Sequence, residues 1–180
     1  LFSGTFAEVI TGLCFGYPFV MSWYWIAGSL LYYFLRERQQ PLPNNPPKLQ
    51  NYPFVSVLLP CFNEEQQLNE TMTVLMQSQY PNFEVVAIND GSSDRTLPML
   101  YELQKQYPNL RVANLTHNQG KSTALNAGLL LSKGDIVVCI DGDALLDPHA
   151  ITWFVRRFLL DKKLGGITGN PRIRNRSSVL

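Results

Sequence analysis

The sequence predicts an α/β fold with a mainly parallel, doubly wound sheet, preceded by one N-terminal transmembrane helix. Three observations predict it: an uncharged apolar run over residues 18–35, five prolines within 39–53, and short apolar runs that alternate with longer amphipathic ones after residue 53. The net charge is only +1, so no bulk attraction to nucleic acid is expected. Three scattered cysteines without a pairing pattern indicate a reducing compartment.

Residues 1–38 are expected to be a membrane segment whose span covers about 18–35. A helix of that length rises about 27 Å, close to the roughly 30 Å thickness of a bilayer's hydrocarbon core. Gly16-Tyr17-Pro18 predicts a break just before the span, because Pro suits the first turn of a helix. Arg36 and Arg38 follow the span, which places the chain after it in the cytoplasm. The alternative is a buried core helix of a soluble protein.

Residues 39–53 are expected to form a stiff, extended spacer, because prolines favour an extended backbone. Residues 54–180 then form the cytoplasmic part. Its β-branched and apolar runs predict strands at 54–59, 83–88, 110–115 and 136–140. Its amphipathic segments predict helices at 64–77, 97–106, 121–132 and from 147 to about 160.

The strand expected at 136–140 is the most apolar of the four, and we expect it to be buried and central. It leads directly into Asp141-Gly142-Asp143, whose two carboxylates can face the same way. Two such acids repel each other unless a divalent cation, Mg²⁺ or Mn²⁺, joins them. A pair of solvated turn acids is the alternative.

The other three strands also end in polar or small residues. These ends are Pro60-Cys61-Phe62-Asn63-Glu64, Asn89-Asp90-Gly91-Ser92 and Asn118-Gln119-Gly120-Lys121. Open α/β sheets bind ligands at the carboxyl ends of their strands, so the four ends should form one crevice. A cation and Lys121 would offset phosphate charge there, and Asp90 could accept a hydrogen bond from a base or ribose, which suits a nucleotide diphosphate.

Two familiar nucleotide motifs are missing. No GxGxxG follows the first expected strand, which argues against a dinucleotide dehydrogenase. Gly120-Lys121-Ser122 resembles the end of a P-loop, but the glycine required five positions before Gly120 is Leu115. Arg172, Arg174 and Arg176 alternate, so on an extended segment they share one face. That face could be a cationic wall near a diphosphate or an acidic lipid surface, or it could be a solvated charged strand.

These motifs, taken in order, resemble the family 2 inverting glycosyltransferases of the GT-A fold. The motifs are Phe54-Val55-Ser56-Val57-Leu58-Leu59-Pro60-Cys61-Phe62-Asn63-Glu64-Glu65, Asn89-Asp90-Gly91-Ser92-Ser93-Asp94, Asn118-Gln119-Gly120-Lys121 and Asp141-Gly142-Asp143. Two longer runs are similar to the bacterial synthases of poly-β-1,6-N-acetyl-D-glucosamine, a biofilm polysaccharide. These runs are Asp141-Gly142-Asp143-Ala144-Leu145-Leu146-Asp147 and Thr168-Gly169-Asn170-Pro171-Arg172-Ile173-Arg174.

The resemblance implies a role for each matching residue. Pro60, Cys61, Asn63 and Glu64 would hold the uridine of the donor together with Asp90, which would lie on the uracil edge. Lys121 would contact the diphosphate. Asp143, with Asp141 beside it, would bind Mg²⁺ or Mn²⁺ and the donor.

The implied reaction is the transfer of N-acetylglucosamine from UDP-GlcNAc to a growing polysaccharide, with inversion, at the cytoplasmic face of a bacterial inner membrane. Membrane lipid and a small membrane subunit would be the other partners. The family's catalytic base lies in a Thr-Glu-Asp type motif and its acceptor region in a Gln-x-x-Arg-Trp type motif, and this chain contains neither. The base, which takes the acceptor's proton, is therefore expected after Leu180, and the chain is expected to be an inactive N-terminal fragment.

Two alternatives stay open. A related synthase could make hyaluronan, chitin, cellulose or a lipid-linked sugar with the same motifs. A membrane subunit without catalytic activity could use the crevice to bind a nucleotide sugar, which the missing base allows and the intact set of Lys121, Asp141 and Asp143 disfavours.

Overall fold

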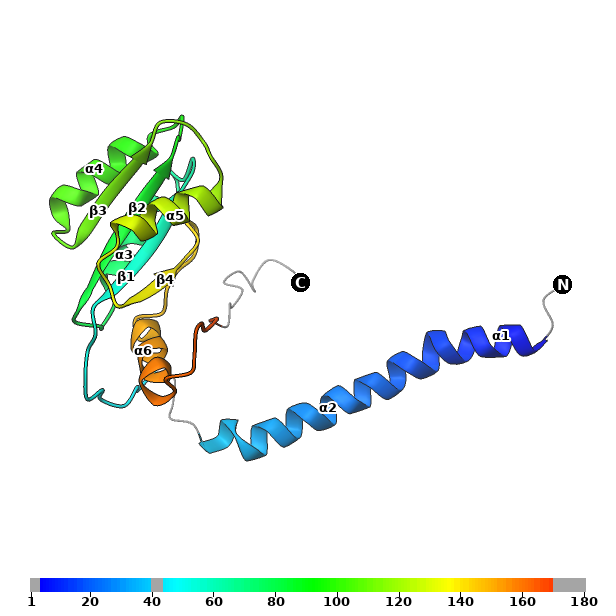
Figure 1. Ribbon diagram of the computed structural model, residues 1–180. Coiled ribbons are helices and arrows are strands. Elements are labelled where there is room, and N and C mark those ends of the chain that lie inside the picture. The colour runs from blue at the N-terminus through cyan, green and yellow to red at the C-terminus, as the bar shows by residue number, and fades with distance from the viewer. Residues whose placement is uncertain (1–3, 40–43, 170–180) are drawn as a thin grey trace. The chain divides into compact units, whose positions relative to one another are not determined.

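The computed structural model describes residues 4–39 and 44–169 (Figure 1), and the chain divides into two compact units, Leu1–Leu42 and Pro43–Leu180. The boundary lies within the proline-rich segment. The first unit is helical, and the second holds the sheet. The roles expected for these parts, membrane anchor and donor-binding domain, stay predictions.

The first unit is one long helical run. It consists of α1 (Gly4–Thr11), the π-helical η1 (Gly12–Gly16), α2 (Tyr17–Leu35) and the short 3₁₀ segment η2 (Glu37–Gln39). The expected start of a helix at Pro18 is confirmed, because α2 begins at Tyr17 with Pro18 in its first turn, but Gly16-Tyr17-Pro18 does not interrupt the helical run. Proline cannot donate a backbone hydrogen bond to the preceding turn, and the π-helical turn before it accommodates this loss.

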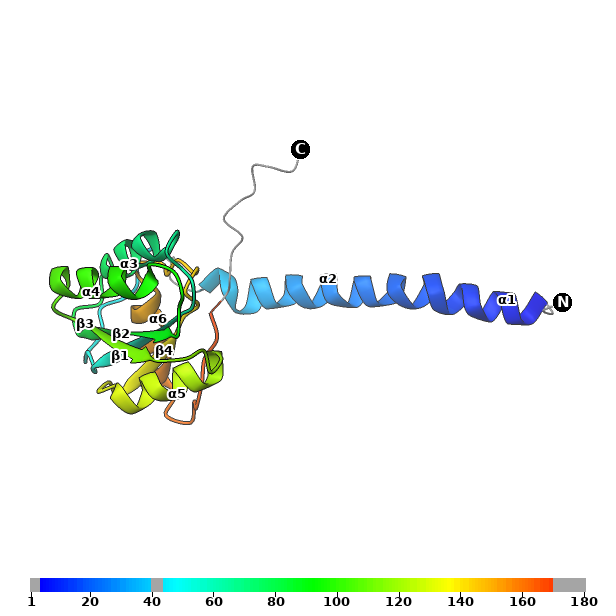
Figure 2. The ribbon, with the colours of Figure 1, turned by 90° about the horizontal axis from the view of Figure 1, so that it is seen from above.

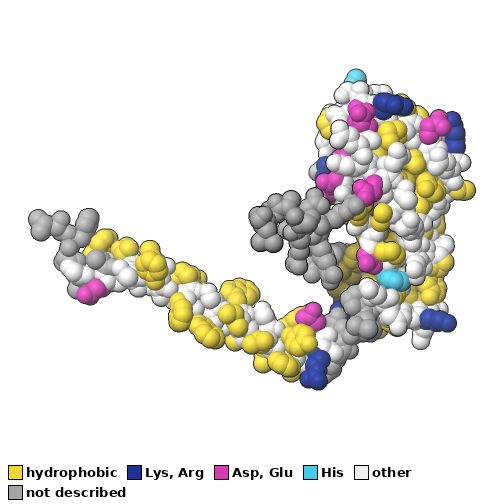
Figure 3. Space-filling model, turned by 180° about the vertical axis from the view of Figure 1, so that it is seen from behind, with side chains coloured by type: hydrophobic (Ala, Val, Ile, Leu, Met, Phe, Trp, Pro, Cys, Tyr) yellow, Lys and Arg dark blue, Asp and Glu magenta, His cyan; other side chains and the backbone are white. Residues whose placement is uncertain are grey.

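None of the residues whose burial is described in this helical run is buried, and most of its apolar side chains are exposed. The stretch Glu8–Leu35 is long and apolar enough to cross a membrane, by length and composition. Figure 3 shows hydrophobic side chains along its visible face. Such a surface is costly in water, and a lipid bilayer would remove that cost.

The second unit holds a four-stranded parallel sheet in the order β3-β2-β1-β4, so the predicted α/β fold with a parallel sheet is confirmed. The strands are β1 (Val55–Cys61), β2 (Phe83–Asp90), β3 (Leu110–Leu115) and β4 (Ile136–Cys139). The helices are α3 (Leu68–Met76), α4 (Thr96–Gln106), α5 (Lys121–Leu131) and α6 (Ala150–Leu160).

Helices cover both faces of the sheet, as a doubly wound fold requires. One face packs against apolar side chains of α3, α4 and α6, including Leu68, Leu100 and Ile151. The other face packs against α5 through Ala124. Figure 2 shows α3 and α4 on one side of the sheet and α5 on the other.

The strand β4 differs from the expectation. It was predicted to be central, but within the described residues it pairs with β1 alone, at the end of the sheet. Ile136 and Val137 are only partly buried. The two central positions belong to β1 and β2, which pair with each other from Val55↔Phe83 to Cys61↔Asn89 and have helices over both faces.

Helices α3 and α6 begin later than predicted because turns precede them. The carbonyl oxygen of Glu64 accepts hydrogen bonds from the backbone N–H groups of Gln67 and Leu68, at 3.1 and 2.9 Å, which closes a turn before α3. Before α6, the Asp147 side chain accepts a bond from the His149 N–H at 2.8 Å. These turns leave the preceding residues free to follow the sheet's carboxyl edge.

The last residues of the expected spacer pack on the sheet unit. The Tyr80 hydroxyl donates to the Pro53 carbonyl at 2.6 Å, and the Asn82 amide donates to the Tyr52 carbonyl at 3.0 Å. Leu49 lies against the core. Burial, with smaller contributions from Tyr52 and Asp135, raises the pKa of Tyr80 to about 12, so the Tyr80 hydroxyl keeps the proton that it donates. This part of the segment is fixed and is not a free spacer.

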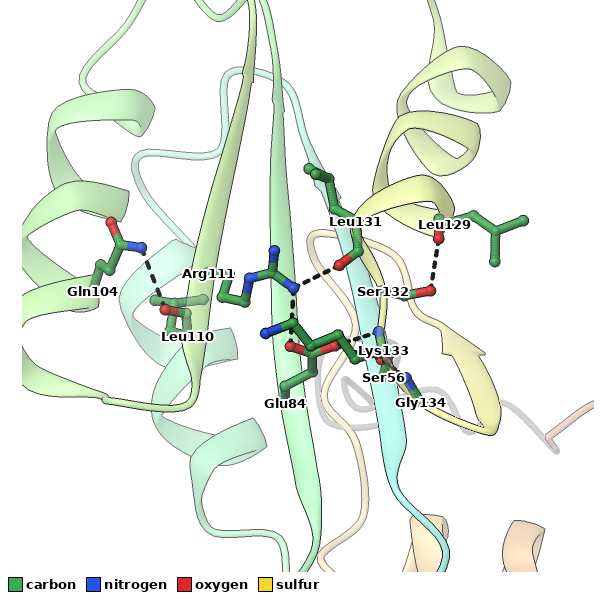
Figure 4. Close-up of polar contacts among 10 residues, drawn as sticks. All are labelled: Ser56, Glu84, Gln104, Leu110, Arg111, Leu129, Leu131, Ser132, Lys133 and Gly134. Carbon is green, nitrogen blue, oxygen red and sulfur yellow. Dashed lines mark hydrogen bonds and ion pairs between the residues drawn. The ribbon is translucent and has the colours of Figure 1, made fainter.

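A buried carboxylate ties together the amino-terminal edge of the sheet (Figure 4). Glu84 is only 5% exposed and accepts hydrogen bonds from Ser56 Oγ at 2.7 Å, Lys133 N at 2.8 Å and Arg111 Nη1 at 3.3 Å. Ser56 Oγ in turn accepts from the Gly134 N–H at 2.8 Å. The cluster fixes the turn between α5 and β4, and no pattern in the sequence predicted it.

Candidate functional site

The carboxyl ends of the strands meet in one cavity of about 370 Å³. Its lining comes from all four strand-end segments named in the sequence: Pro60, Cys61, Phe62, Glu64, Asp90, Asn118, Gly120, Lys121, Asp141, Gly142 and Asp143. Parallel strands place their carboxyl ends along one edge, which is why residues 80 positions apart share a cavity. The structure thus brings together seven of the eight predicted site residues.

The exception is Asn63, which does not line this cavity. Its backbone adopts a φ of +57°, and its N–H donates to Ser92 Oγ at 3.1 Å. Its side-chain oxygen accepts from the Ser93 N–H at 2.9 Å. Asparagine tolerates the left-handed conformation better than most residues, and here it joins the loop after β1 to the loop after β2.

Asp90 is 4% exposed, and both of its carboxylate oxygens accept backbone hydrogen bonds from the loop before α5. The Gln119 N–H donates to Oδ1 at 2.8 Å and the Gly120 N–H to Oδ2 at 2.9 Å. Gly91 follows with a φ of +66°, and a Cβ there would come within 2.4 Å of the Asn118 backbone nitrogen. Asp90 therefore holds the Lys121 loop in place while it lines the cavity.

Glu64 lies beside the acid pair. Its backbone N–H donates to Thr96 Oγ1 at 2.8 Å, which fixes the residue over the start of α4. Burial and the negative charges of Asp143 and Asp94 raise the pKa of the Glu64 carboxyl. Glu64 and Asp143 line the same cavity, so negative charge is concentrated on this wall.

On the same wall, the Lys121 ammonium forms an ion pair with Asp141 Oδ1. Lys121 is the first residue of α5, and Asp141 follows β4, so the pair joins the start of that helix to the loop after that strand. Cys61 also lines the cavity, and burial together with the charge of Glu64 raises its pKa to about 12. Its thiol therefore stays protonated and is a poor nucleophile near neutral pH.

The donor set suits a divalent cation that is shared with a ligand. Within residues 4–39 and 44–169, no three His, Cys, Asp or Glu side chains gather closely enough to hold a metal by themselves. Asp141 and Asp143 nevertheless line one cavity. Mg²⁺ is commonly held by one or two carboxylates together with substrate phosphates and water, so this pair fits such a cation.

Several lining residues were quoted in the motifs but not assigned a role. Asn118, Gly120 and Gly142 contribute to the wall, and Phe62 lies in it with 46% of its surface exposed. A large exposed aromatic residue directly after a buried strand is the sequence signal that could have identified Phe62. Arg172, Arg174 and Arg176 lie outside the described residues.

Comparison with known proteins gives the chain a family. The model of "Glycosyl transferase family 2" matches residues 56–177. Poly-β-1,6-N-acetyl-D-glucosamine synthase of Staphylococcus epidermidis is 39% identical over 169 residues, and that of Staphylococcus aureus (strain COL) is 39% identical over 165. Each alignment covers 91% of this chain and 40% of the relative, so the chain spans about two fifths of these curated relatives.

Two solved structures are similar in fold. The mannosyltransferase PcManGT of Pyrobaculum calidifontis, in complex with GDP-Man and Mn²⁺, matches with a TM-score of 0.66 and 28% identity, over 84% of this chain and 43% of that one. Staphylococcus aureus TarS 1–349 in complex with UDP-GlcNAc matches with a TM-score of 0.56 and 25% identity, over 67% and 37%. The sequence match and the crevice at the strand ends agree, and the chain belongs to glycosyl transferase family 2.

Proposed function

We propose that this chain is the donor-binding part of a membrane-anchored inverting glycosyltransferase that transfers N-acetylglucosamine from UDP-GlcNAc to a growing β-1,6-linked poly-N-acetylglucosamine. The observation that carries the proposal is the convergence of Asp90, Lys121, Asp141 and Asp143 in one cavity. The 39% identity to a poly-β-1,6-N-acetyl-D-glucosamine synthase supports this particular product. The general base and the acceptor site are proposed to lie beyond Leu180.

Each side chain has a task in binding the donor. Asp90 is already fixed by two backbone N–H groups, and a carboxylate has further lone pairs with which to accept from the uracil edge. Pro60, Cys61 and Glu64 form the wall beside it, and Lys121 is the cation for the diphosphate. Asn63 contributes indirectly, by fixing the loop that carries this wall.

Asp141 and Asp143 are the residues that would hold Mg²⁺ or Mn²⁺. When bound, such a cation neutralises the charge that develops on the leaving nucleoside diphosphate. Asp143 has its partner acid Asp141 two residues away, and Gly142 between them presents no side chain to the cavity. The two carboxylates can therefore approach a ligand from one wall.

The location proposed is the cytoplasmic side of a bacterial inner membrane. Glu8–Leu35 has the length and composition of a span, and Arg36 and Arg38 follow it. A growing polysaccharide, membrane lipid and a small membrane subunit are the proposed partners. The residues before 39 are the proposed anchor, and 54–180 the proposed donor-binding part, with nucleic acid not expected as a ligand.

The test is calorimetric titration of the detergent-solubilised chain with UDP-GlcNAc, UDP-glucose and GDP-mannose, each with Mn²⁺, Mg²⁺ or EDTA. GDP-mannose belongs in the panel because PcManGT was solved with GDP-Man. We expect UDP-GlcNAc to bind best and only with a divalent cation. Asp143→Asn should abolish the cation-dependent binding of UDP-GlcNAc. It should cost little stability, because the substitution leaves no cavity in the fold and relieves the repulsion between Asp143 and the neighbouring carboxylates.

A second measurement follows incorporation of labelled N-acetylglucosamine into acid-insoluble polymer. The 180 residues alone should make none. Polymer from this chain alone would place the base within residues 1–180. Preference for GDP-mannose would overturn the proposed donor. UDP-GlcNAc binding that is unchanged both by EDTA and by Asp143→Asn would overturn the proposed cation site.

A further inference from the structure

The ion pair between Lys121 and Asp141 lies inside the cavity to which the proposed function assigns two different ligands. Lys121 is to contact a diphosphate, and Asp141 is to contact a divalent cation. In the structure they contact each other, with side chains 59% and 60% exposed. Of the three ion pairs in the described part of the chain, it is the one between residues that line this cavity.

The pair sits on two fixed supports. The loop before Lys121 is held by Asp90 through the Gln119 and Gly120 N–H groups. The backbone around Asp141 is held by two hydrogen bonds: the Ile140 N–H donates to the Leu58 carbonyl at 3.1 Å, and the Ala144 N–H donates to the Asp141 carbonyl at 3.0 Å. The two side chains therefore face each other because their backbones are fixed, and separating them requires only rotation of exposed side chains.

We propose that Lys121 competes with the divalent cation for Asp141, so that the ligand-free site binds the cation weakly and the nucleotide diphosphate releases it. When a diphosphate draws the ammonium away, Asp141 becomes available beside Asp143. The cation and the nucleotide then bind cooperatively. This inference rests on the proposed function only in taking the ligand to be a nucleoside diphosphate with a divalent cation, and not on any sugar or product.

The charge distribution of the site supports this coupling. No three metal-binding side chains gather in the described residues, so a cation needs ligand oxygens to complete its coordination. Glu64, Asp141 and Asp143 line one cavity, so three carboxyl groups face it together with Lys121. The ammonium offsets part of their negative charge, and a bound cation would do so once the ammonium contacts the phosphate.

The size of the effect follows from the exposure of the pair. Exposed ion pairs typically contribute a free energy of a few tenths of a kcal/mol to about 1 kcal/mol. That range corresponds to a change in cation affinity of roughly two- to five-fold. Linkage is reciprocal, so the cation must raise the affinity for UDP by the same factor by which UDP raises the affinity for the cation. Removing Lys121 should lower this shared factor.

The experiment measures Mn²⁺ binding to the detergent-solubilised chain without nucleotide, from the free-ion signal in electron paramagnetic resonance. We expect Lys121→Met to bind Mn²⁺ about two- to five-fold more tightly than the unmodified chain. Lys121→Arg keeps the charge and should bind like the unmodified chain. Lys133→Met removes the same charge at the other end of α5 and should change nothing, because its backbone N–H, not its side chain, makes the bonds described above.

A double-mutant cycle separates the effect of the Lys121–Asp141 contact from the long-range electrostatic effect of the Lys121 charge. In Asp141→Asn no carboxylate remains for Lys121 to hold, so adding Lys121→Met should improve Mn²⁺ binding less than it does in the unmodified chain. The same four proteins are then titrated with UDP, with and without Mn²⁺. The enhancement of UDP binding by Mn²⁺ should be smaller in Lys121→Met than in the unmodified chain.

Two results would overturn the inference: Mn²⁺ binding that is unchanged by Lys121→Met, or an equal gain in both backgrounds of the cycle. Neither depends on the donor sugar or on polymer formation. A chain that prefers GDP-mannose or makes another polymer would defeat the proposed function and leave the competition intact. Cooperative UDP–Mn²⁺ binding without a Lys121 effect would defeat the competition and leave the proposed function intact.

Discussion

Glu64 lies directly against Gly142, the glycine between the two acids. A methyl group on Gly142 would come within 3.2 Å of Glu64 Cγ and 3.3 Å of its Oε1, and within 3.1 Å of the Pro60 carbonyl oxygen. These distances are shorter than ordinary contacts, so the neighbours would have to give way by a few tenths of an ångström. The glycine lets the loop after β1 close against the acid pair.

Gly142→Ala should therefore weaken binding more than stability. The added methyl must displace either Glu64 or the backbone that carries Asp141 and Asp143, so we expect Mn²⁺-dependent UDP binding to fall by tenfold or more. Unfolding free energy should change by less than about 1 kcal/mol, because the site is a loop edge and not the core. Calorimetry and thermal unfolding measure the two quantities.

Gly166→Ala is the matched control, because a Cβ there would meet nothing within 4 Å. It should leave both UDP binding and stability unchanged. If Gly142→Ala binds UDP and Mn²⁺ like the unmodified chain, the contact with Glu64 does not position the acid pair.

Asp90 and Lys121 should separate on comparing a nucleoside with its diphosphate. Lys121→Ala should weaken UDP far more than uridine, by a factor of about ten to over a hundred for one charge-assisted contact. Asp90→Asn should weaken the binding of both ligands alike. Its NH₂ group would replace one of the two oxygens that accept the N–H groups of Gln119 and Gly120, and an NH₂ group cannot accept a hydrogen bond. Titrations with uridine and UDP give the ratios, and equal losses for both ligands in the Lys121 variant would contradict its role.

Glu84 should make stability depend on pH. Burial alone would raise its pKa, but hydrogen bonds from Ser56, the Lys133 N–H and Arg111 outweigh burial and lower the pKa below its ordinary 4.5. A lowered pKa contributes stability that is present above pH 4.5 and is lost as the pH falls through the folded-state value. Glu84→Gln should therefore cost about 1–3 kcal/mol at pH 7, and the difference should shrink below about pH 4.

Denaturant unfolding of both proteins at pH 7 and pH 3 measures this difference. Glu102→Gln is the control: Glu102 pairs with Lys105 at 2.9 Å on the surface, where both side chains are about two thirds exposed or more, so its loss should matter little at either pH. A penalty for Glu84→Gln that stays constant across the pH range would mean that packing, and not the charge, is lost.

The orientation of the membrane segment can be tested with two reporter fusions after Asn45. Arg36 and Arg38 follow the apolar stretch, so a reporter active only in the cytoplasm should work and one active only in the periplasm should not. Replacing both arginines with glutamine should reduce the preference. A working periplasmic reporter would contradict the cytoplasmic location proposed for the site.

The pattern of apolar and polar residues was enough to predict the strands and helices of the sheet unit and the edge of the sheet at which the site forms. A nearly continuous apolar run such as the one in Phe83–Asp90 indicates a strand that is buried on both faces. Where a helix connects two neighbouring strands, those strands are parallel. Once the strands are parallel, their polar ends must share one edge, so the sequence alone groups Asp90, Lys121 and the acid pair at that edge. The family motifs add the ligands that this edge is expected to bind.

The contacts between individual side chains could be known only from the packed fold. Ser56, Glu84 and Lys133 are far apart in the chain, and their hydrogen bonds depend on the register of β1 with β2 and on where α5 returns to the sheet. The Lys121–Asp141 pair and the place of Asn63 between two loops have the same origin. Periodic patterns record how deeply each residue is buried, but contact requires two backbones at one distance, and only the packed chain sets that distance.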